Sequence, residues 1–314
     1  MNNFKKIGLT ALAGALVSVS ANAAELSVTG GAGLTFVGQE KQNTGNGWTM
    51  TDALTFAATT EMDNGWNVTV SQIIDSSDGA VGAIMDTRIM TIDMGDSGTL
   101  TFSGTGGSSV LAAIDDVTPS ANEESWALVT GADTIPGGTG GDNMIHYSNS
   151  SLMDGVTVSA SYTPSDNQTH IESSSDYGIA YTGIDGLTIG AATGENNAAA
   201  ASLDISNMYV TYAADAFTVG YQTSESDSET ADADLDFTAM GISYAVSDDM
   251  SVSLNTSTID YEDSSLSDQE ATGVSVSYVM GSMTMSATHN TVDNIAGTAT
   301  DDRSGYELNL TFAF

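Results

Sequence analysis

Carboxylates supply most of the side-chain chemistry that this sequence could perform. Its 314 residues include 41 Asp and Glu, but five Lys and Arg, three His and no Cys. One long polar stretch, residues 105–142, contains six of the acids: Asp115, Asp116, Glu123, Glu124, Asp133 and Asp142. Groups of Asp and Glu attract cations, so metal ions and positively charged solutes are compatible partners.

The sequence contains no recognisable catalytic or metal-binding motif. His146, His170 and His289 are far apart, and none belongs to an HExxH or another metal-ligand spacing. The acidic stretch 225–236 has the composition of a calcium loop, but it lacks the Gly at the sixth position and the final Glu of an EF-hand. No Ser-His-Asp set stands out. We therefore predict no enzyme, no cofactor and no defined metal site, while weak binding of Ca²⁺ or Mg²⁺ at acidic loops stays open.

The first 23 residues have the layout of a signal peptide. A basic start, MNNFKK, is followed by the apolar run IGLTALAGALVSV and by SANA, whose small residues fit a cleavage site after Ala23. The apolar run is too short for a spanning helix, which needs about 20 residues. We therefore expect export and a mature chain of residues 24–314.

The mature chain is strongly acidic. Only Lys41, Arg88 and Arg303 remain against 41 acids, which gives a net charge of −38 with His neutral. Nucleic acid is excluded as a partner, because binding to phosphates needs clustered Lys and Arg. No later run of about 18 apolar residues occurs, so no transmembrane helix is expected.

Short segments with a period of two recur along the chain. VTVSASY at 156–162, FTVGYQ at 217–222 and VSVSYVM at 274–280 alternate larger apolar residues with small polar ones. The C-terminal GYELNLTFAF places Tyr306, Leu308, Leu310, Phe312 and Phe314 on one face of an extended strand. Such alternation is typical of strands with one apolar face.

Tight and long connections alternate between these segments. The tight ones, which contain Asp-Gly and similar turn residues, lie at 63–65, 96–98, 154–155, 185–186, 215–216, 248–249 and 281–282. The long polar ones lie at about 39–48, 78–86, 105–142, 165–175, 196–205, 227–234, 263–268 and 294–301. Seven tight turns that alternate with eight long loops predict sixteen strands.

The alternation favours a transmembrane barrel over a soluble sandwich. In a membrane barrel one rim carries short periplasmic turns and the other carries long external loops. Pairing of the first strand with the last closes the sheet and leaves no open edge in lipid. We expect an all-β, 16-stranded antiparallel barrel, with the apolar row at the C-terminus facing lipid and the polar row facing the lumen.

Four segments together resemble Gram-negative general diffusion porins, particularly those of alphaproteobacteria. They are AAELSVTGGAGLTF, TRIMTIDMGDSGTLTFSG, NMIHYSNSSLMDGVTVSASY and the terminal Phe314. The resemblance implies a homotrimer in the outer membrane, among lipid and lipopolysaccharide. It also implies that Phe314, with Phe312 and Leu310, forms the signal that the barrel-insertion machinery reads. A further implication is that the third long loop, about 105–142, folds inward and narrows the pore.

The resemblance also suggests residues for the constriction. Asp115, Asp116, Glu123, Glu124 and Asp133 lie on the loop, and Arg88 and His146 match positions near wall arginines of the family. His146 has the opposite parity to Tyr147, which favours the lumen. Arg88 shares parity with Met90, Ile92 and Met94, which favours the outer face, so its placement stays open.

The expected function is passive diffusion of small hydrophilic solutes and ions, with a preference for cations. Rings of Asp and Glu favour cations, and a narrow, low-dielectric passage focuses their field. Two alternatives stay open: a substrate-specific channel on the same fold, and a secreted acidic adhesin or surface-layer protein.

Overall fold

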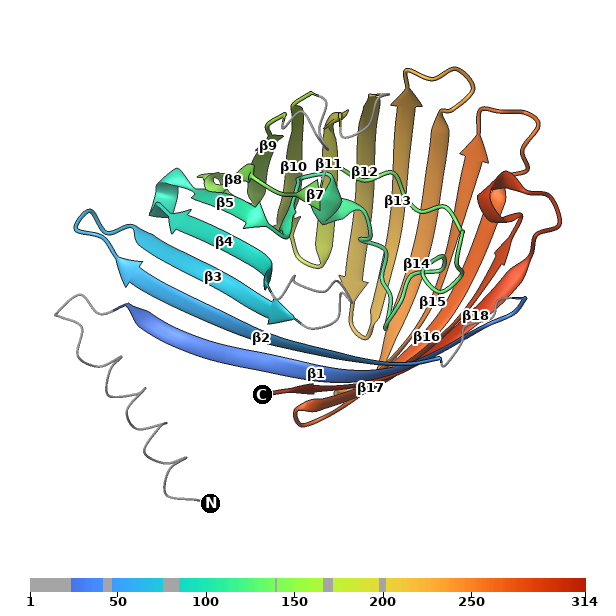
Figure 1. The fold of residues 1–314 in the computed structure, drawn as a ribbon, viewed down its shortest axis with the longest axis horizontal. Helices are drawn as coiled ribbons and strands as arrows, with labels where there is room; N and C mark the ends of the chain where they lie inside the picture. The colour runs from blue at the N-terminus through green and yellow to red at the C-terminus, as the bar shows by residue number, and fades with distance from the viewer. Residues whose placement is uncertain (1–23, 42–46, 76–84, 139, 166–171, 198–201) are drawn as a thin grey trace.

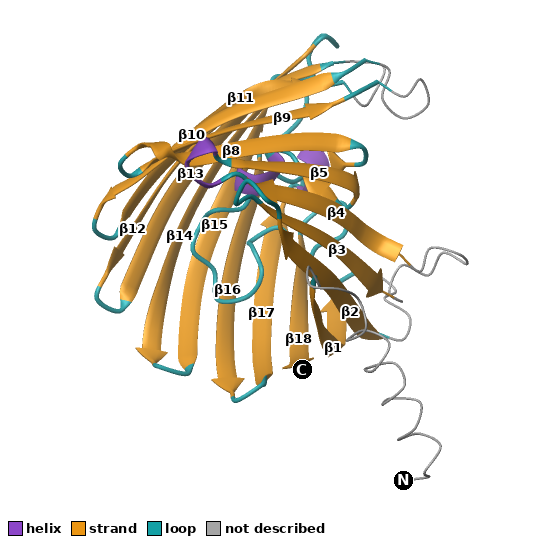
Figure 2. Ribbon diagram, turned by 90° about the vertical axis from the view of Figure 1, so that its left-hand side faces the viewer, coloured by secondary structure: helices purple, strands orange, loops and turns teal. Residues whose placement is uncertain are grey.

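The chain forms a closed barrel of sixteen antiparallel strands, which confirms the expected fold class. The structure is a computed structural model that describes residues 24–41, 47–75, 85–138, 140–165, 172–197 and 202–314. The expected signal peptide, residues 1–23, lies outside the described residues. Figures 1 and 2 show the sheet curving round until its first and last strands meet.

The barrel strands follow one another in chain order, and each pairs with its neighbours in sequence. Their bounds are β1 (Glu25–Gln39), β2 (Trp48–Glu61), β3 (Asn67–Asp75), β4 (Met85–Asp93), β5 (Thr99–Thr105), β8 (Met144–Met153), β9 (Val156–Thr163), β10 (Ser174–Ile184), β11 (Leu187–Asn196), β12 (Leu203–Ala214), β13 (Phe217–Ser228), β14 (Leu235–Ser247), β15 (Met250–Tyr261), β16 (Gln269–Met280), β17 (Met283–Asp293) and β18 (Arg303–Ala313).

Two further strands and three short helices lie in the connections. The strands β6 (Gly107–Ser108) and β7 (Gly140–Gly141) pair with each other apart from the barrel. The 3-10 helices are η1 (Gly95–Ser97), η2 (Ala112–Ile114) and η3 (Ile295–Gly297). No helix in the described part of the chain is long and apolar enough to cross a membrane.

Pairing of β1 with β18 closes the ring. The register runs from Gly31 opposite Ala313 to Gln39 opposite Gly305. Beyond the strand, the amide of Phe314 donates to the Gly30 carbonyl at 2.8 Å, and the Gly30 amide donates to the Phe314 carbonyl at 2.7 Å. The last residue of the chain is therefore part of the hydrogen-bonded seam.

The connections have the expected alternation of lengths. The seven tight turns all join neighbouring strands at one end of the barrel, which we call the turn end; the opposite end is the loop end. Several tight turns use a residue with positive φ, such as Gly155 (φ 70°), Gly186 (φ 73°) and Asp215 (φ 51°). Such backbone conformations suit two-residue hairpins and disfavour bulky side chains.

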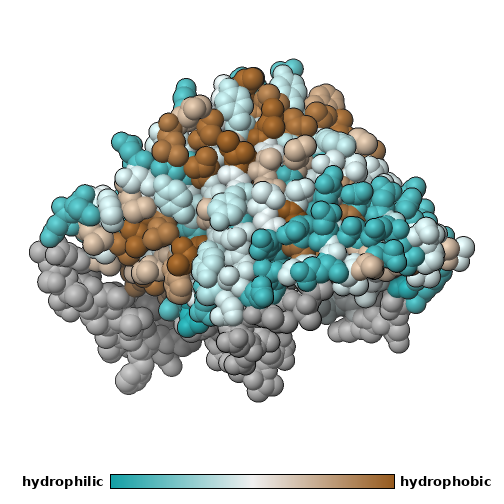
Figure 3. Space-filling model, turned by 90° about the horizontal axis from the view of Figure 1, so that it is seen from above, coloured by the Kyte–Doolittle hydropathy of each residue, from teal (hydrophilic) through white to brown (hydrophobic). Residues whose placement is uncertain are grey.

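The two faces of the sheet differ in polarity. Large apolar side chains project from the outer face along almost every strand, including Ile189, Met208 and Tyr221. Figure 3 shows hydrophobic side chains gathered in patches on one side of the molecule, with hydrophilic side chains gathered beside them. The residues that alternate with them on the same strands point inward. They are mostly small polar residues and amides, such as Asn207 and Gln222. The sequence alternation predicted this division.

The barrel wall is not equally tall all round. Strands β3 and β4 have 9 residues each, β5 has 7 and β9 has 8, whereas β1 has 15 and β14 has 13. We call the low side, β3–β5 with β8 and β9, the short wall. It is continuous with the long segment between β5 and β8 that enters the barrel.

A lysine on the outer face should cost far more stability than a lysine on the inner face. Met208, near the middle of β12, is 62% exposed on the apolar face, whereas Thr211 on the same strand has the opposite parity. We expect Met208→Lys to lower the free energy of unfolding in lipid vesicles by about 2–4 kcal/mol. Thr211→Lys is the matched control and should change it by much less. Equal losses in urea titrations would contradict the assignment of the faces.

Candidate functional site: an acidic loop inside the barrel

The connection between β5 and β8, residues 106–143, folds into the barrel, as expected for the third long loop. We call it the inward loop. Its two limbs meet at a neck, where Gly107 pairs with Gly141 and Ser108 with Gly140. A side chain on Gly141 would collide with the backbone of Gly107, so the close approach of the limbs requires glycine.

The first limb is fixed to the wall by a small apolar cluster and two hydrogen bonds. Val110 and Leu111 pack with Ala192 and Ile205 of β11 and β12. The Val110 amide donates to Ser161 Oγ at 3.0 Å, and the Leu111 amide donates to an oxygen of Asp176 at 3.3 Å. From these contacts the loop continues along the inner wall toward β12 and β13.

Amide side chains of the wall then hold the loop backbone. Asn207 Nδ2 donates to the Ile114 carbonyl at 3.1 Å, and Gln222 Nε2 donates to the same oxygen at 2.7 Å. Gln222 also accepts from the Val117 amide at 3.3 Å. Buried backbone groups need such partners, so wall side chains bind the loop backbone where the short helix η2 ends.

Amide side chains of the wall also bind the loop backbone at Glu123 and Glu124. Asn290 Nδ2 donates to the Glu124 carbonyl at 2.6 Å, and Asn255 Nδ2 lies 3.5 Å from the Glu123 carbonyl. Between the two amides, Gly273 has no side chain; a Cβ there would collide with both amide oxygens. Because the wall binds the backbone carbonyls of Glu123 and Glu124, their carboxylates are left for other interactions.

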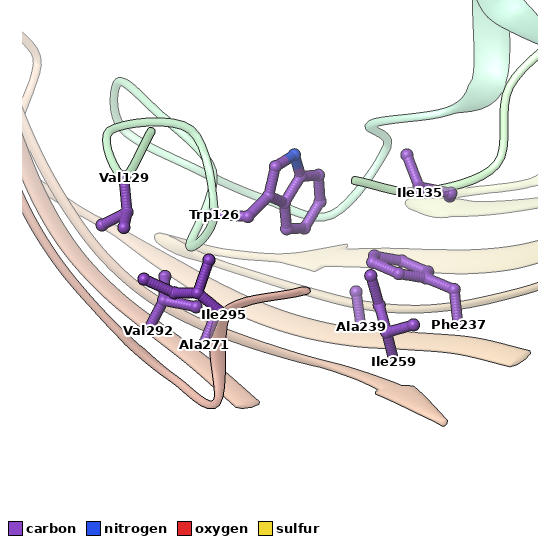
Figure 4. Packing of buried hydrophobic residues seen from close by; sticks show 9 residues of the cluster. All are labelled: Trp126, Val129, Ile135, Phe237, Ala239, Ile259, Ala271, Val292 and Ile295. Carbon is purple, nitrogen blue, oxygen red and sulfur yellow. The ribbon is translucent and has the colours of Figure 1, made fainter. Parts of the chain in front are cut away.

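A larger apolar cluster holds the far end of the inward loop. Trp126, Val129 and Ile135 of the loop pack on Ile295 of η3 and on inward-facing residues of the wall strands, as Figure 4 shows: Phe237, Ala239, Ile259, Ala271 and Val292. The rings of Trp126 and Phe237 meet edge to face, with centroids 5.2 Å apart and planes at 88°. Such pairs contribute about 0.5–1.5 kcal/mol beyond the area that they bury.

The loop turns back at the seam of the barrel. Gln39 of β1 donates to the Leu128 carbonyl and to Thr130 Oγ1, and Arg303 of β18 donates to the Thr130 carbonyl at 3.1 Å. On the return path the Asp133 amide donates to Gln269 at 2.9 Å, and the Tyr261 hydroxyl donates to an Asp133 carboxylate oxygen at 2.7 Å. Asp133 is thus held against the wall.

Four of the expected constriction acids lie close enough to repel one another. Asp115, Asp116, Glu123 and Glu124 interact electrostatically, although six residues separate the two pairs in sequence. We call these four residues the acidic cluster. Burial, followed by repulsion from Asp116, raises the pKa of Asp115 to about 6. Burial, with repulsion from Asp116, Glu123 and Asp115, raises the pKa of Glu124 to about 7.

A wall residue extends the acidic cluster. Burial raises the pKa of Glu123, and repulsion from Glu307 of β18 adds to this effect. Glu307 lies on the inner face, between the outward-facing Tyr306 and Leu308, and its Oε1 accepts a hydrogen bond from Asn309. Parity alone places Glu307 in the lumen, but only the path of the inward loop shows that it meets Glu123.

The structure does not bring Arg88 to the acidic cluster. Arg88 lies on the outer face, in a groove of about 280 Å³ that Val70, Met90 and Phe102 also line. It pairs with Gln72 in the ladder and keeps the parity of Met90, as the apolar pattern indicated. Its inclusion among the constriction residues, taken from the family position, is therefore corrected: alternation along β4 turns the side chain outward.

His146 lies at the neck of the inward loop. Its Nδ1 is 3.4 Å from the Ser108 carbonyl, and it lies near Asp176 of β10. Its inward orientation agrees with the parity argument. It lies beside the first limb of the loop, which begins at this neck, and not among the four acids of the cluster.

The Asp and Glu residues of the described ranges do not form a site that could coordinate a metal ion directly. No group of three or more His, Asp or Glu there has the spacing to hold a metal ion. The acidic cluster is a group of like charges on a loop that the wall holds in place.

A closed antiparallel barrel with an apolar outer face and a loop fixed inside its lumen defines a membrane channel of the porin type. The model of the Gram-negative porin family matches residues 8–265, and the chain belongs to that family. This membership places the protein in the bacterial outer membrane. No curated protein matches the chain.

Several solved structures share the fold at low sequence identity. The anion-selective porin from Comamonas acidovorans is 12% identical with a TM-score of 0.71, and the match covers 93% of this chain and 100% of that chain. OmpT of Vibrio cholerae in its trimer form is 12% identical with a TM-score of 0.69, over 93% and 99%. Salmonella typhi OmpF in complex with daunomycin is 13% identical with a TM-score of 0.69, over 94% and 99%.

Loss of the Trp126 ring should release the inward loop without opening the barrel. Trp126 is 8% exposed and packs on Phe237, whereas Trp66 lies in the turn between β2 and β3 and is 36% exposed. We expect Trp126→Ala to remove about 3–5 kcal/mol of packing and to make residues 106–143 sensitive to protease. Trp66→Ala is the control. Equal protection of the loop in both variants would contradict this account of its attachment.

Proposed function

We propose that this porin is a passive diffusion channel for small hydrophilic solutes and ions, and that it prefers cations. The acidic cluster carries the proposal. Its four carboxylates lie on a loop whose backbone is fixed to the inner wall, so the charges have a defined position in the lumen. A rigid, narrow passage lined by Asp and Glu favours cations.

The positions of the basic residues support this preference. Lys41 donates to the Asp302 carbonyl at 2.7 Å, and Arg303 pairs with Asp301 at 2.5 Å, both near the loop end. Arg88 lies on the outer face. These three are the only Lys and Arg after residue 23, so the acidic cluster is not balanced by an opposing row of arginines.

The fold itself does not decide the sign of the selectivity. The porin from Comamonas acidovorans is anion-selective and shares the barrel at 12% identity. The charges of the side chains that line the passage must therefore decide which ions pass. In this chain those side chains are mainly acids, amides and hydroxyls.

We propose further that three barrels associate through the short wall. One similar structure, OmpT of Vibrio cholerae, is described as a trimer. On the short wall Arg88 and Gln72 face outward beside Val70, Met90 and Phe102. A charged group at the middle of a lipid-facing wall is costly, and a contact between protomers would remove Arg88 from lipid.

We also propose that the C-terminus serves as the insertion signal and that lipopolysaccharide surrounds the loop end. Phe314 is 72% exposed and Phe312 is 43% exposed on the outer face, next to Leu310. An exposed terminal aromatic row that joins the seam is accessible to an insertion machinery until the barrel closes.

The alternatives differ in their support. A secreted adhesin is incompatible with the closed barrel and the family match. A substrate-specific channel remains the second candidate. Saturable block of the current by one solute would favour it over general diffusion.

Neutralisation of two cluster acids should reduce the preference for cations. We expect Glu123→Gln/Glu124→Gln to shift the reversal potential in a KCl gradient toward zero, because two of the four cluster charges are lost. Asp248→Asn/Asp249→Asn, in the turn between β14 and β15, is the control with the same change in net charge. A reversal potential that indicates anion preference in the unchanged protein would overturn the proposal.

Selectivity should also depend on pH near neutrality. The pKa values of about 6 for Asp115 and about 7 for Glu124 mean that both groups are ionised at pH 8 and neutral at pH 5. Lowering the pH through this window removes negative charge, so the permeability ratio of K⁺ to Cl⁻ should fall.

The same shifts have a consequence for stability. Because the folded-state pKa values are raised, the folded protein binds these protons more tightly than the unfolded chain. The free energy of unfolding should therefore increase, through these two groups, as the pH falls from about 7 toward 4.

For the selectivity, reversal potentials that stay constant between pH 8 and pH 5 would contradict the position of the acidic cluster in the conducting path.

A further inference from the structure

The last connection of the barrel, between β17 and β18, reaches from the loop end to the inward loop. It consists of residues 294–302 and contains η3. The Ile295 side chain is 4% exposed and belongs to the apolar cluster that holds the far end of the inward loop. Figure 4 shows Ile295 beside Val292, in the same group as Val129 of the inward loop. We call residues 294–302 the clasp.

Ile295 lies at the bend where the inward loop turns back. The loop has a positive φ of 89° at Gly131, and a Cβ there would lie 3.7 Å from Ile295 Cγ2. The preceding residue, Thr130, accepts hydrogen bonds from Gln39 and Arg303 of the barrel seam. The clasp and the seam therefore both contact the bend.

One buried amide side chain binds both the clasp and the inward loop. Gln269, at the start of β16, is 2% exposed. Its Oε1 accepts from the Ala296 amide of the clasp at 3.1 Å and from the Asp133 amide of the inward loop at 2.9 Å. Its Nε2 donates to the Asp133 carbonyl at 2.9 Å. The same side chain thus fixes the position of each segment relative to the other.

The clasp holds an unfavourable backbone conformation. Asn294 (φ 54°), Ala296 (φ 49°) and Thr300 (φ 69°) lie in the left-handed region, which is costly for residues with a Cβ. The Asn294 amide donates to Asp302 Oδ1 at 3.1 Å, and its Nδ2 donates to the Asp268 carbonyl at 3.0 Å. Its Oδ1 accepts from the Thr300 amide at 3.2 Å. Such conformations persist only where surrounding contacts hold them.

The neighbouring connection supports the clasp. This connection, residues 262–268, joins β15 to β16. The Ser267 amide donates to the Gly297 carbonyl at 2.9 Å. A Cβ at Gly297, where φ is 72°, would lie 2.8 Å from Leu266 Cβ, so the two connections approach closely. The clasp is therefore a folded unit of the loop end.

We propose that the clasp positions the far end of the inward loop through Ile295. While this side chain is seated, residues 128–135 stay on the wall. When it leaves, the left-handed residues of the clasp can relax and the bend is free to move. Glu124 lies two residues before Trp126, so this motion reaches the acidic cluster.

The clasp gives the outer surface of the barrel a route to the constriction. Long loops face outward in membrane barrels, so a contact made on the clasp from outside can move the inward loop. Ile295 acts only as a positioning residue, because it touches the loop and not the permeating ions. The proposal rests on the place of the inward loop in the barrel and is independent of the ion preference proposed above.

A single thiol can report the release of the loop. The chain has no cysteine, and Ala132, which is partly buried, packs against the apolar cluster. In an Ala132→Cys background, Ile295→Ala should speed the reaction of this thiol with a water-soluble maleimide by at least about fivefold, the lower end for coupling between two sites. The measurement uses the folded barrel in detergent and does not require conduction.

The chain offers a closely matched control. Ile205 of β12 is 2% exposed and packs on the first limb of the same inward loop. Ile205→Ala makes the same chemical change away from the clasp, so the reaction rate of the thiol at position 132 should stay unchanged.

Two further variants separate positioning from general stability. Ile295→Val removes one methyl group and should restore most of the protection. Ala296→Gly keeps the Ile295 side chain and relieves the left-handed strain, so the thiol should react more slowly. In planar bilayers, Ile295→Ala should enlarge the fluctuations of the open-channel current, and Ile295→Val should bring them back toward those of the unchanged protein.

Equal acceleration in the two Ile→Ala variants would overturn the proposal, because it would show general loosening. A labelling rate that Ile295→Ala leaves unchanged, or that Ala296→Gly increases, would also contradict it. Heat-modifiable mobility on gels checks that each variant has folded. If Ile295→Ala does not fold, the test becomes the comparison of Ile295→Val with Ile205→Val, of which the first must label faster.

Discussion

The structure depends on one constraint: every backbone polar group that lies within lipid must find a partner inside the protein. Closure of the sheet between β1 and β18 meets this constraint, and the pairing reaches the last residue, Phe314. The two-residue period then follows, because a closed wall has one face toward lipid and one toward water. The inward loop obeys the same requirement, since side-chain amides such as Gln222 and Asn290 bind its carbonyls.

The backbone, the apolar side chains and the carboxylates of the inward loop have different roles. Wall side chains bind its backbone, apolar residues such as Trp126 anchor its far end, and the carboxylates of Glu123 and Glu124 are left for the lumen. Burial and mutual repulsion raise the pKa values of Asp115 and Glu124 toward the physiological range. The acids thus have a fixed position and a charge that responds to pH near neutrality.

Much of the fold could be predicted from the sequence because its determinants are local. Alternation within segments such as 217–222 defined the strands, and turn residues at 154–155 and 185–186 defined the hairpins. The contacts of the inward loop could not be predicted, because they join residues far apart in sequence. Phe237 and Ile259 have the parity of lumen residues, and only the loop explains why they are apolar. For the same reason the sequence does not reveal the contact of Glu307 with Glu123. The placement of Arg88 stayed open in the sequence, because its parity and the family position pointed to opposite faces; the structure turns it outward.

The central claim is that the inward loop is fixed to the wall in the conducting protein. Ser125 Oγ lies 2.9 Å from Ser257 Oγ, and the chain contains no cysteine. The most direct test is the single-channel conductance of Ser125→Cys/Ser257→Cys before and after reduction. We predict that a disulfide forms without added catalyst and that the conductance is the same in both states. Failure to form the disulfide in folded protein, or a large rise in conductance upon reduction, would contradict the fixed loop.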